Sequence, residues 1–293
     1  MKKVRKAVIP VAGYGTRFLP YTKAVPKPLL PILNKPAIQV ISEEVVESGI
    51  EEILFVVGYK KEIIESHFDS APELEDVLES KGKFDFLKAV KKPSEMAEFT
   101  YVLQEVQNGT ASAVALAENF VNGEPFAVLF GDDVMYSDSG RPVIGQLIDV
   151  YEKYGKTVLG CKRVSMDDIS KYAAVEFDEV LEPDVYRMTK VTEKPKKEEA
   201  KSDLAPLGRY VCTPEIFDII RDLKPGANGE YQFTDALDEI ARKSGAIAYA
   251  FHGTRYDMGD RFGYLTANIE YGLRDEELRE KLTNYIKELA DKI

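Results

Sequence analysis

A short loop after the first apolar run of the chain gathers residues suited to phosphate binding. Gly13, Gly15 and Arg17 come directly after the run 7–11, and Lys27 follows in a segment rich in proline. Glycines let backbone N–H groups approach a phosphate closely, and fixed cationic side chains neutralise its charge. The loop therefore has the residues needed to bind a polyphosphate.

This loop fits neither of two common nucleotide-binding motifs. Phe18 stands where the dinucleotide-binding pattern G-x-G-x-x-G requires its third glycine, and the second strand runs into 58–60 without an acidic residue for a ribose. The P-loop pattern G-x-x-x-x-G-K-[ST] does not occur. A nicotinamide-dependent dehydrogenase is therefore excluded, and the two glycines alone are weak evidence because turns also use glycine.

Two aspartates follow apolar runs and could bind a metal ion. Asp132 follows the run 126–130, and Asp257 lies in 256–260 after another apolar run. Carboxylates at strand ends often act as helix caps or turn residues instead. Together with phosphate oxygens, however, a pair of carboxylates suits Mg²⁺, which prefers hard oxygen ligands and keeps several waters.

The longer string around the loop is more specific than its glycines. G-x-G-T-R-x-x-P, followed by P-K-P-L-L-P, resembles the signature of sugar-1-phosphate nucleotidyltransferases, and the resemblance extends over nearly the whole chain. It looks closest to the bacterial uridylyltransferases of that family, through segments that include 35–39, 208–210 and 232–236. The resemblance implies UTP and glucose 1-phosphate as substrates, Mg²⁺ as cofactor, release of pyrophosphate, and a homo-oligomer.

The same resemblance implies roles for individual residues. Arg17 and Lys27 match positions that grip the triphosphate, and Lys194 matches the lysine of an E-K-P motif that contacts the sugar phosphate. Asp132 and Asp257 match the aspartates that bind the metal. The expected nucleotide-binding residues are Ala12, Gly13, Gly15, Gln104 and Gly109, and the expected sugar-binding residues are Ala173, Glu193, Gly208 and Glu230.

Three departures from the family pattern leave the choice of substrate open. Ala111 and Ser112 stand where relatives commonly have glycine and histidine, and Ala173 stands where glycine usually faces the hexose. Pro28 replaces the usual glutamate of uridylyltransferases and resembles thymidylyltransferases. Transfer from dTTP, or to another sugar phosphate, is therefore an alternative. A non-catalytic nucleotide-binding regulator is a third hypothesis. A protein that only binds nucleotide, however, has little need of both phosphate-binding cations and a pair of metal-binding aspartates.

These side chains require an alternating α/β architecture to position them. Apolar runs at 7–11, 53–57, 99–104 and 126–130 alternate with amphipathic segments at 37–48, 60–68 and 111–120. The pattern predicts a Rossmann-like mixed, mostly parallel sheet flanked by helices, with chemistry at the carboxyl ends of its strands. We expect a charged helix and loop at 72–83, an antiparallel sugar-binding lobe from 157 onward, and an outward loop at 193–203.

We expect one nucleotidyltransferase domain over 1–293. Its nucleotide-binding part would span about 1–155, its sugar-binding part about 156–260, and a C-terminal helical segment about 261–293. The last segment alternates apolar and charged residues at helical spacing, which predicts an amphipathic helix that packs on this domain or on another subunit.

Composition narrows the class of protein further. A net charge of -11 over 293 residues argues against nucleic acid as a partner, because binding to a phosphate backbone needs a basic surface. No apolar stretch approaches the roughly 20 residues that cross a bilayer, and no signal peptide is evident, so we expect a cytoplasmic protein without a membrane partner. Cys161 and Cys212 indicate neither a zinc site nor a disulfide framework, and His67 and His252 belong to no catalytic triad pattern.

Overall fold

In the computed structural model, which describes residues 2–226 and 229–292, alternating apolar residues bury both faces of a central sheet. In β1 (Lys6–Pro10), Ile9 packs into one hydrophobic cluster and Val8 into a second cluster on the opposite face. β4 (Glu52–Val57) is parallel to β1 and repeats this division, with Phe55 on the first side and Leu54 on the second. Side chains alternate with a period of two, so an apolar run without polar gaps fills two cores.

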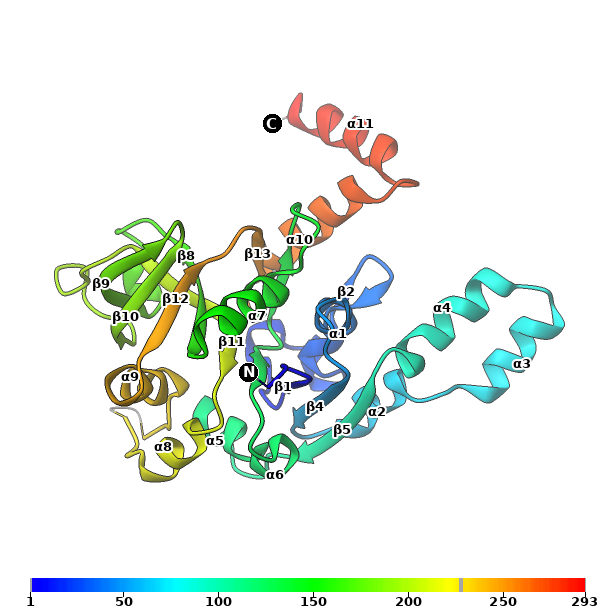
Figure 1. The fold of residues 1–293 in the computed structure, drawn as a ribbon. Helices are drawn as coiled ribbons and strands as arrows, with labels where there is room; N and C mark the ends of the chain where they lie inside the picture. Colours follow the sequence, from blue (N-terminus) through cyan, green and yellow to red (C-terminus); the bar gives the residue numbers. More distant parts are fainter. Residues whose placement is uncertain (1, 227–228, 293) are drawn as a thin grey trace.

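The central sheet has nine strands, and helices cover both of its faces (Figure 1). The first four strands in spatial order are mutually parallel. β11 and β10 run against the others, so the sheet is mixed but mostly parallel in strand direction, as predicted. The order is β5 (Glu98–Leu103), β4, β1, β6 (Phe126–Leu129), β11 (Leu204–Cys212), β8 (Thr157–Arg163), β12 (Ala246–Ala250), β10 (Val185–Thr192) and β9 (Ala174–Glu182).

Two layers of helices complete the cores. The first cluster lies under α1 (Ala37–Glu47), α2 (Lys61–Phe68) and α7 (Val143–Tyr154), and the second under α5 (Thr110–Ala115), α6 (Glu118–Val121), α8 (Ile216–Asp222) and α9 (Phe233–Lys243). No helix in the described ranges is both long and apolar enough to cross a membrane.

A small second sheet adjoins the candidate metal residues, since Asp257 ends one of its strands and Asp132 directly precedes the other. β7 (Asp133–Tyr136) pairs antiparallel with β13 (Thr254–Asp257), and the register sets Asp133 opposite Asp257. α10 (Arg261–Arg274) begins directly afterwards, because the Asp260 side chain accepts hydrogen bonds from two backbone N–H groups of its first turn. A further short pair, β2 (Pro31–Ile32) and β3 (Lys35–Pro36), precedes α1.

Several segments differ from the sequence-based expectations. The helix expected at 111–120 is interrupted by a turn and becomes α5 and α6. The insertion expected to end at residue 83 continues into a second helix, so that α3 (Pro72–Ser80) and α4 (Phe84–Glu95) form a hairpin that projects from the body (Figure 1). Packing of the two helices on one another, which sequence periodicity does not report, explains the added helix.

The C-terminal segment is two helices rather than one. Asp275 adopts an extended conformation that ends α10, and its carboxylate accepts hydrogen bonds from the backbone N–H groups of Glu277 and Leu278. α11 (Arg279–Ala290) then leaves at an angle and projects away from the sheet (Figure 1). In the sugar-side lobe the expected antiparallel pairing holds for β11, β10 and β9, but β12 runs parallel to β8.

Candidate active site

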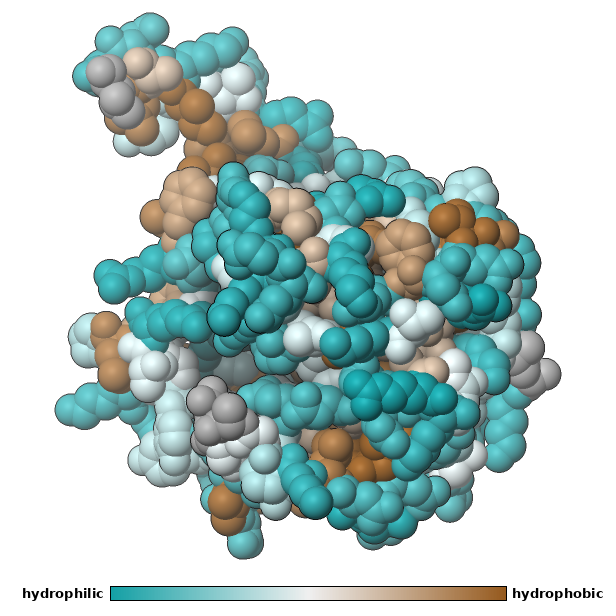
Figure 2. All heavy atoms as spheres, turned by 90° about the vertical axis from the view of Figure 1, so that its left-hand side faces the viewer, coloured by the Kyte–Doolittle hydropathy of each residue, from teal (hydrophilic) through white to brown (hydrophobic). Residues whose placement is uncertain are grey.

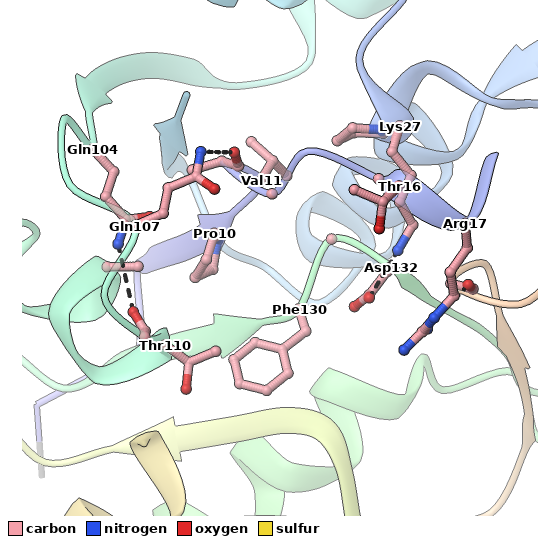
Figure 3. A pocket seen from close by; sticks show the side chains of 18 of the residues that line it. Pro10, Val11, Thr16, Arg17, Lys27, Gln104, Gln107, Thr110, Phe130 and Asp132 are labelled. Carbon is pink, nitrogen blue, oxygen red and sulfur yellow. Dashed lines mark hydrogen bonds and ion pairs between the residues drawn. The ribbon is translucent and has the colours of Figure 1, made fainter. Parts of the chain in front are cut away.

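A cavity of about 500 Å³ opens at the carboxyl ends of the parallel strands (Figure 3). Three segments line it: the loop after β1, the segment after β5, and the turn after β6. Ligands of open α/β sheets bind at this edge. The expected site residues among those lining it are Ala12, Gly13, Gly15, Arg17, Lys27, Gln104, Gly109, Asp132 and Glu230.

The loop after β1 folds back on itself and leaves Gly13 open to the cavity. Thr22 Oγ1 donates a hydrogen bond of 2.9 Å to the carbonyl of Gly15. A Cβ at Gly15 would lie 2.8 Å from Lys27 Cβ, so this position packs against the segment that presents the lysine. A Cβ at Gly13, by contrast, would meet no atom within 4 Å. The open space beside Gly13 is available to a ligand.

Two cations converge at one end of the cavity (Figure 3). Arg17 Nη1 donates to the carbonyl of Gly259 at 3.1 Å, and Lys27 Nζ lies 2.9 Å from Asp132 Oδ2. Burial alone would raise the pKa of Asp132, but the charge and hydrogen bond of the Lys27 ammonium, together with the Arg255 guanidinium, hold that pKa below its usual value. Asp132 is therefore held as a carboxylate anion beside the Lys27 ammonium.

Amide groups occupy the other end of the cavity. Gln104 Nε2 lies 3.4 Å from both the Gly109 carbonyl and Ser112 Oγ. Gly109 has a φ of +124°, and a Cβ there would lie 2.3 Å from the carbonyl oxygen of Tyr231. Only glycine fits so close to Tyr231. A hydrogen bond of 2.9 Å from the N–H of Ala111 to the Tyr231 carbonyl holds the two segments at this distance. The backbone around Gly109 is thus fixed to present polar groups to a ligand.

Gln107 also lines the cavity, although no motif or periodicity in the sequence singles it out. Its Nε2 donates a 2.7 Å hydrogen bond to the Ala12 carbonyl and so joins the loop after β1 to the segment after β5 (Figure 3). Ala12, expected to offer backbone contacts, has its carbonyl already engaged.

Asp132, in the turn after β6, and Asp257, at the end of β13, meet at the same corner. The N–H of Met258 donates to the Asp132 carbonyl at 2.8 Å, and Asp257 Oδ1 accepts the N–H of Gly259 at 2.7 Å. Asp257 does not itself line the cavity, but its neighbour Gly259 does. A Cβ at Gly259 would lie 2.8 Å from Asp257 Oδ1 and 3.2 Å from Lys27 Nζ, so the two aspartates flank the same lysine.

The donor set at this corner fits a magnesium ion. In the part of the chain that the structure describes, no cluster of three or more His, Cys, Asp or Glu side chains is placed to hold a metal by itself. Mg²⁺ is usually bound by one or two carboxylates together with substrate phosphates and waters. Two aspartates beside a phosphate-sized cavity meet that requirement.

A third carboxylate, Asp133, is buried directly behind this pair. Burial raises the pKa of Asp133 to about 6, in spite of the nearby Arg255 guanidinium. Arg255 Nε lies 2.6 Å from Asp133 Oδ1. Beneath them, the buried Arg209 donates to the Asp133 carbonyl at 2.8 Å and forms a 2.7 Å ion pair with Glu44. Sequence analysis assigned no role to Asp133 or to either arginine.

Three residues expected on the sugar side, Ala173, Glu193 and Lys194, lie in the neighbouring lobe rather than in the cavity. The Lys194 side chain is 64% exposed, and its ammonium lies 3.9 Å from Glu193 Oε1. Glu193 Oε2 accepts a 2.8 Å hydrogen bond from Thr234 Oγ1. The N–H of Lys194 donates to the carbonyl of Tyr172 at 3.0 Å, which places the buried Ala173 beside the E-K-P segment.

Gly208 and Glu230 occupy different surroundings from these three. A Cβ at Gly208, whose φ is +66°, would lie 2.2 Å from Asp133 Oδ2, so Gly208 makes room for the buried carboxylate. Glu230 lines the cavity and accepts a 2.8 Å hydrogen bond from Gln232 Nε2. The structure thus brings Glu230 to the nucleotide-side cavity and Gly208 to the aspartate cluster.

Comparisons with known proteins give a consistent picture. Residues 6–272 match a family described as Nucleotidyl transferase. The chain is 47% identical over 289 residues to a UTP–glucose-1-phosphate uridylyltransferase from Staphylococcus epidermidis, covering 99% of both chains. Among solved structures, a UDP-glucose pyrophosphorylase complexed with UDP-glucose matches with a TM-score of 0.85 and 39% identity, over 93% of this chain and 100% of that one. A UTP-bound UGPase from Acinetobacter baumannii matches with a TM-score of 0.91 and 33% identity, over 98% of this chain and 99% of that one.

Proposed function

The chain belongs to the nucleotidyl transferase family, and on this premise we propose that it transfers a uridylyl group from UTP to glucose 1-phosphate, giving UDP-glucose and pyrophosphate. Relatives of similar length carry that activity in their names, and two matching structures hold UTP and UDP-glucose. The observation within this chain that carries the proposal is one cavity with paired cations and an aspartate at one end and amides at the other.

The reaction needs charge neutralisation rather than a side-chain nucleophile. A phosphate oxygen of glucose 1-phosphate forms a bond to the α-phosphorus of UTP, the bond from that phosphorus to the bridging oxygen breaks, and pyrophosphate leaves with the electron pair. Both reactants are anions, so positioning and electrostatic stabilisation supply the catalysis. Arg17 and Lys27, at one end of the cavity, would bind the triphosphate and stabilise the departing pyrophosphate.

Asp132 and Asp257 would hold Mg²⁺ between the protein and the phosphates. A bound magnesium ion would polarise the phosphoryl oxygens and template the two reactants. Lys27, which pairs with Asp132 at 2.9 Å, would be released toward the triphosphate once another cation neutralises that carboxylate. Gln104, Gly109 and the backbone of Gly13 and Gly15 would then orient the nucleotide.

The sugar phosphate would approach from the lobe that carries Lys194. The exposed ammonium of Lys194 is free to reach a phosphate, since its nearest carboxylate lies at 3.9 Å. Glu193 would accept hydrogen bonds from sugar hydroxyls, with Ala173 beside it. Glu230 at the cavity and Gly208 at the aspartate cluster would border the sugar from the nucleotide side. The exposure of Lys194 is what a side chain needs if it is to turn toward a substrate that arrives second.

Pyrophosphate release with Mg²⁺ and glucose 1-phosphate tests this proposal, with UTP compared against dTTP, CTP, ATP and GTP. We expect strong preference for UTP. We also expect pyrophosphate release to be lost in Lys194→Ala, because the sugar phosphate then lacks a cation. Lys190→Ala is the matched control, since Lys190 lies nearby on β10 and pairs with Glu176 at 3.7 Å and with no other carboxylate in 2–226 and 229–292. Preference for dTTP, which Pro28 leaves open, would instead support thymidylyl transfer. No pyrophosphate release with any nucleotide and any sugar phosphate would support the hypothesis of a non-catalytic regulator.

We also propose a cytoplasmic homo-oligomer. Cys161 and Cys212 are buried free thiols, which suits a reducing compartment. The oligomer is supported by apolar side chains on the projecting C-terminal helices, which Figure 2 shows in brown. Tyr285 and Leu289 on α11 are 60% and 42% exposed, and exposed apolar side chains that gather in one patch mark interaction surfaces.

A further inference from the structure

The carboxylate of Glu193 is held by a side chain from the first turn of α9. Thr234 Oγ1 donates a hydrogen bond of 2.8 Å to Glu193 Oε2. Within the described ranges Glu193 Oε1 accepts no hydrogen bond from the protein, and the Lys194 ammonium lies 3.9 Å from it. One oxygen of this half-buried carboxylate is therefore bound by the protein, and the other is left for a ligand.

The Thr234 hydroxyl holds Glu193 against a charge of the same sign. Asp235 is the next residue of α9, and its pKa is raised by burial and further by the nearby Glu193 charge. The two carboxylates therefore repel one another. The attraction of Glu193 to Lys194 is weak, because an ammonium whose side chain is 64% exposed is screened by solvent. The hydrogen bond from Thr234 is thus the contact that keeps Glu193 in place.

The chain just before Thr234 is joined to the base side of the cavity. The N–H of Tyr231 donates to the carbonyl of Asn108 at 2.8 Å, and the N–H of Phe233 donates to Thr110 Oγ1 at 3.0 Å. Thr110 lines the end of the cavity where the amide groups lie (Figure 3). The first turn of α9 therefore has a fixed position relative to the groups that would orient the nucleotide.

We propose that Thr234 is a positioning residue that holds Glu193 ready for the hydroxyl groups of the sugar phosphate. This inference rests on the proposed function, in which Glu193 binds the sugar. Thr234 occupies Oε2 and leaves Oε1 to accept hydrogen bonds from the hexose. Because the chain before Thr234 is bonded to the segment that carries Thr110, the spacing between the sugar glutamate and the base is set before either substrate binds.

Equilibrium binding of UDP-glucose and of UDP, measured by calorimetry with Mg²⁺ present, tests the inference without turnover. The ratio of the two Kd values gives the contribution of the glucose unit. Thr234→Val keeps the shape of the side chain and removes its donor. We expect UDP to bind as in wild type and UDP-glucose to bind about three- to tenfold more weakly, because a free Glu193 side chain must be ordered when the sugar binds.

Two further variants separate positioning from a structural effect. Thr234→Ser restores the hydroxyl and should restore the UDP-glucose affinity. In the Glu193→Ala background, adding Thr234→Val should change that affinity by less than about twofold, because the carboxylate that Thr234 holds is gone. An equal loss from Thr234→Val with and without Glu193 would overturn the inference.

Thr189→Val is the matched control in the same lobe. Thr189 lies on β10, and its hydroxyl donates to the backbone carbonyl of Glu176 at 3.2 Å rather than to a carboxylate. We expect its affinities for UDP and UDP-glucose to equal those of wild type. Thr234→Ala replaces Thr234→Val if the valine variant does not fold.

The same titrations distinguish failure of the inference from failure of the proposed function. Wild-type protein that binds neither UDP nor UDP-glucose would contradict the proposed function, and this inference would be overturned with it. If the wild type binds UDP-glucose more tightly than UDP, and Thr234→Val keeps that difference unchanged, the proposed function stands and Thr234 has no positioning role.

Discussion

At the scale of single residues, a substitution at Gly13 can weaken ligand binding without changing the stability of the fold. A methyl group there meets no protein atom within 4 Å, yet Gly13 lines the cavity. We expect Gly13→Ala to lower kcat/KM for UTP by about tenfold or more, because one added carbon in a close-fitting pocket is costly. Its unfolding temperature should match that of wild type. Steady-state kinetics and thermal unfolding of one preparation check both halves, and unchanged kinetics would remove Gly13 from the nucleotide contacts.

At the scale of secondary-structure elements, the buried pair Arg209 and Glu44 joins β11 to α1 beneath the site. Both side chains are buried, and Glu44 Oε1 also accepts the N–H of Ile144 at the start of α7. Removing one partner of such a pair leaves an uncompensated charge, so we expect Arg209→Met to reduce the free energy of unfolding by about 3 to 5 kcal/mol.

Denaturant unfolding measures this loss, and a second variant shows whether it arises from charge. Glu44→Leu combined with Arg209→Met removes both charges and replaces them with apolar side chains, which is often close to neutral. We expect the double variant to recover most of the lost stability. A double variant as unstable as Arg209→Met would mean that packing or the Asp133 contact, rather than the unpaired Glu44 carboxylate, accounts for the effect.

At the scale of the whole molecule, the projecting C-terminal helices carry exposed apolar side chains (Figure 2), which the proposed homo-oligomer would bury. None of the residues described in α11 is buried. We expect Tyr285→Lys/Leu289→Lys to lower the molar mass measured by light scattering after size-exclusion chromatography, because charge opposes burial of that face. Asn284→Lys/Glu288→Gln adds the same net charge on the same helix and should leave the mass unchanged. Equal masses for wild type and both variants would place any subunit contact elsewhere.

Much of the fold was predictable because its signals are local. Strands buried on both faces appear as unbroken apolar runs, and the helices between them appear as amphipathic segments, so the α/β architecture and its site-bearing edge followed from periodicity. Where a neighbour supplies the stabilising contact, the pattern failed. α4 depends on packing against α3, and the break between α5 and α6 lies within one continuous apolar pattern.

The sequence by itself determined the reaction class, through a loop signature whose glycines and cations lie within fifteen residues of one another. Only the tertiary structure decided which groups meet across long separations. It pairs Lys27 with Asp132, hydrogen-bonds Gln107 to the Ala12 carbonyl, and places Arg255 between Asp133 and Asp257. Strand order and register create these contacts, and neither is encoded in local spacing, because each depends on how the whole sheet packs between its two cores.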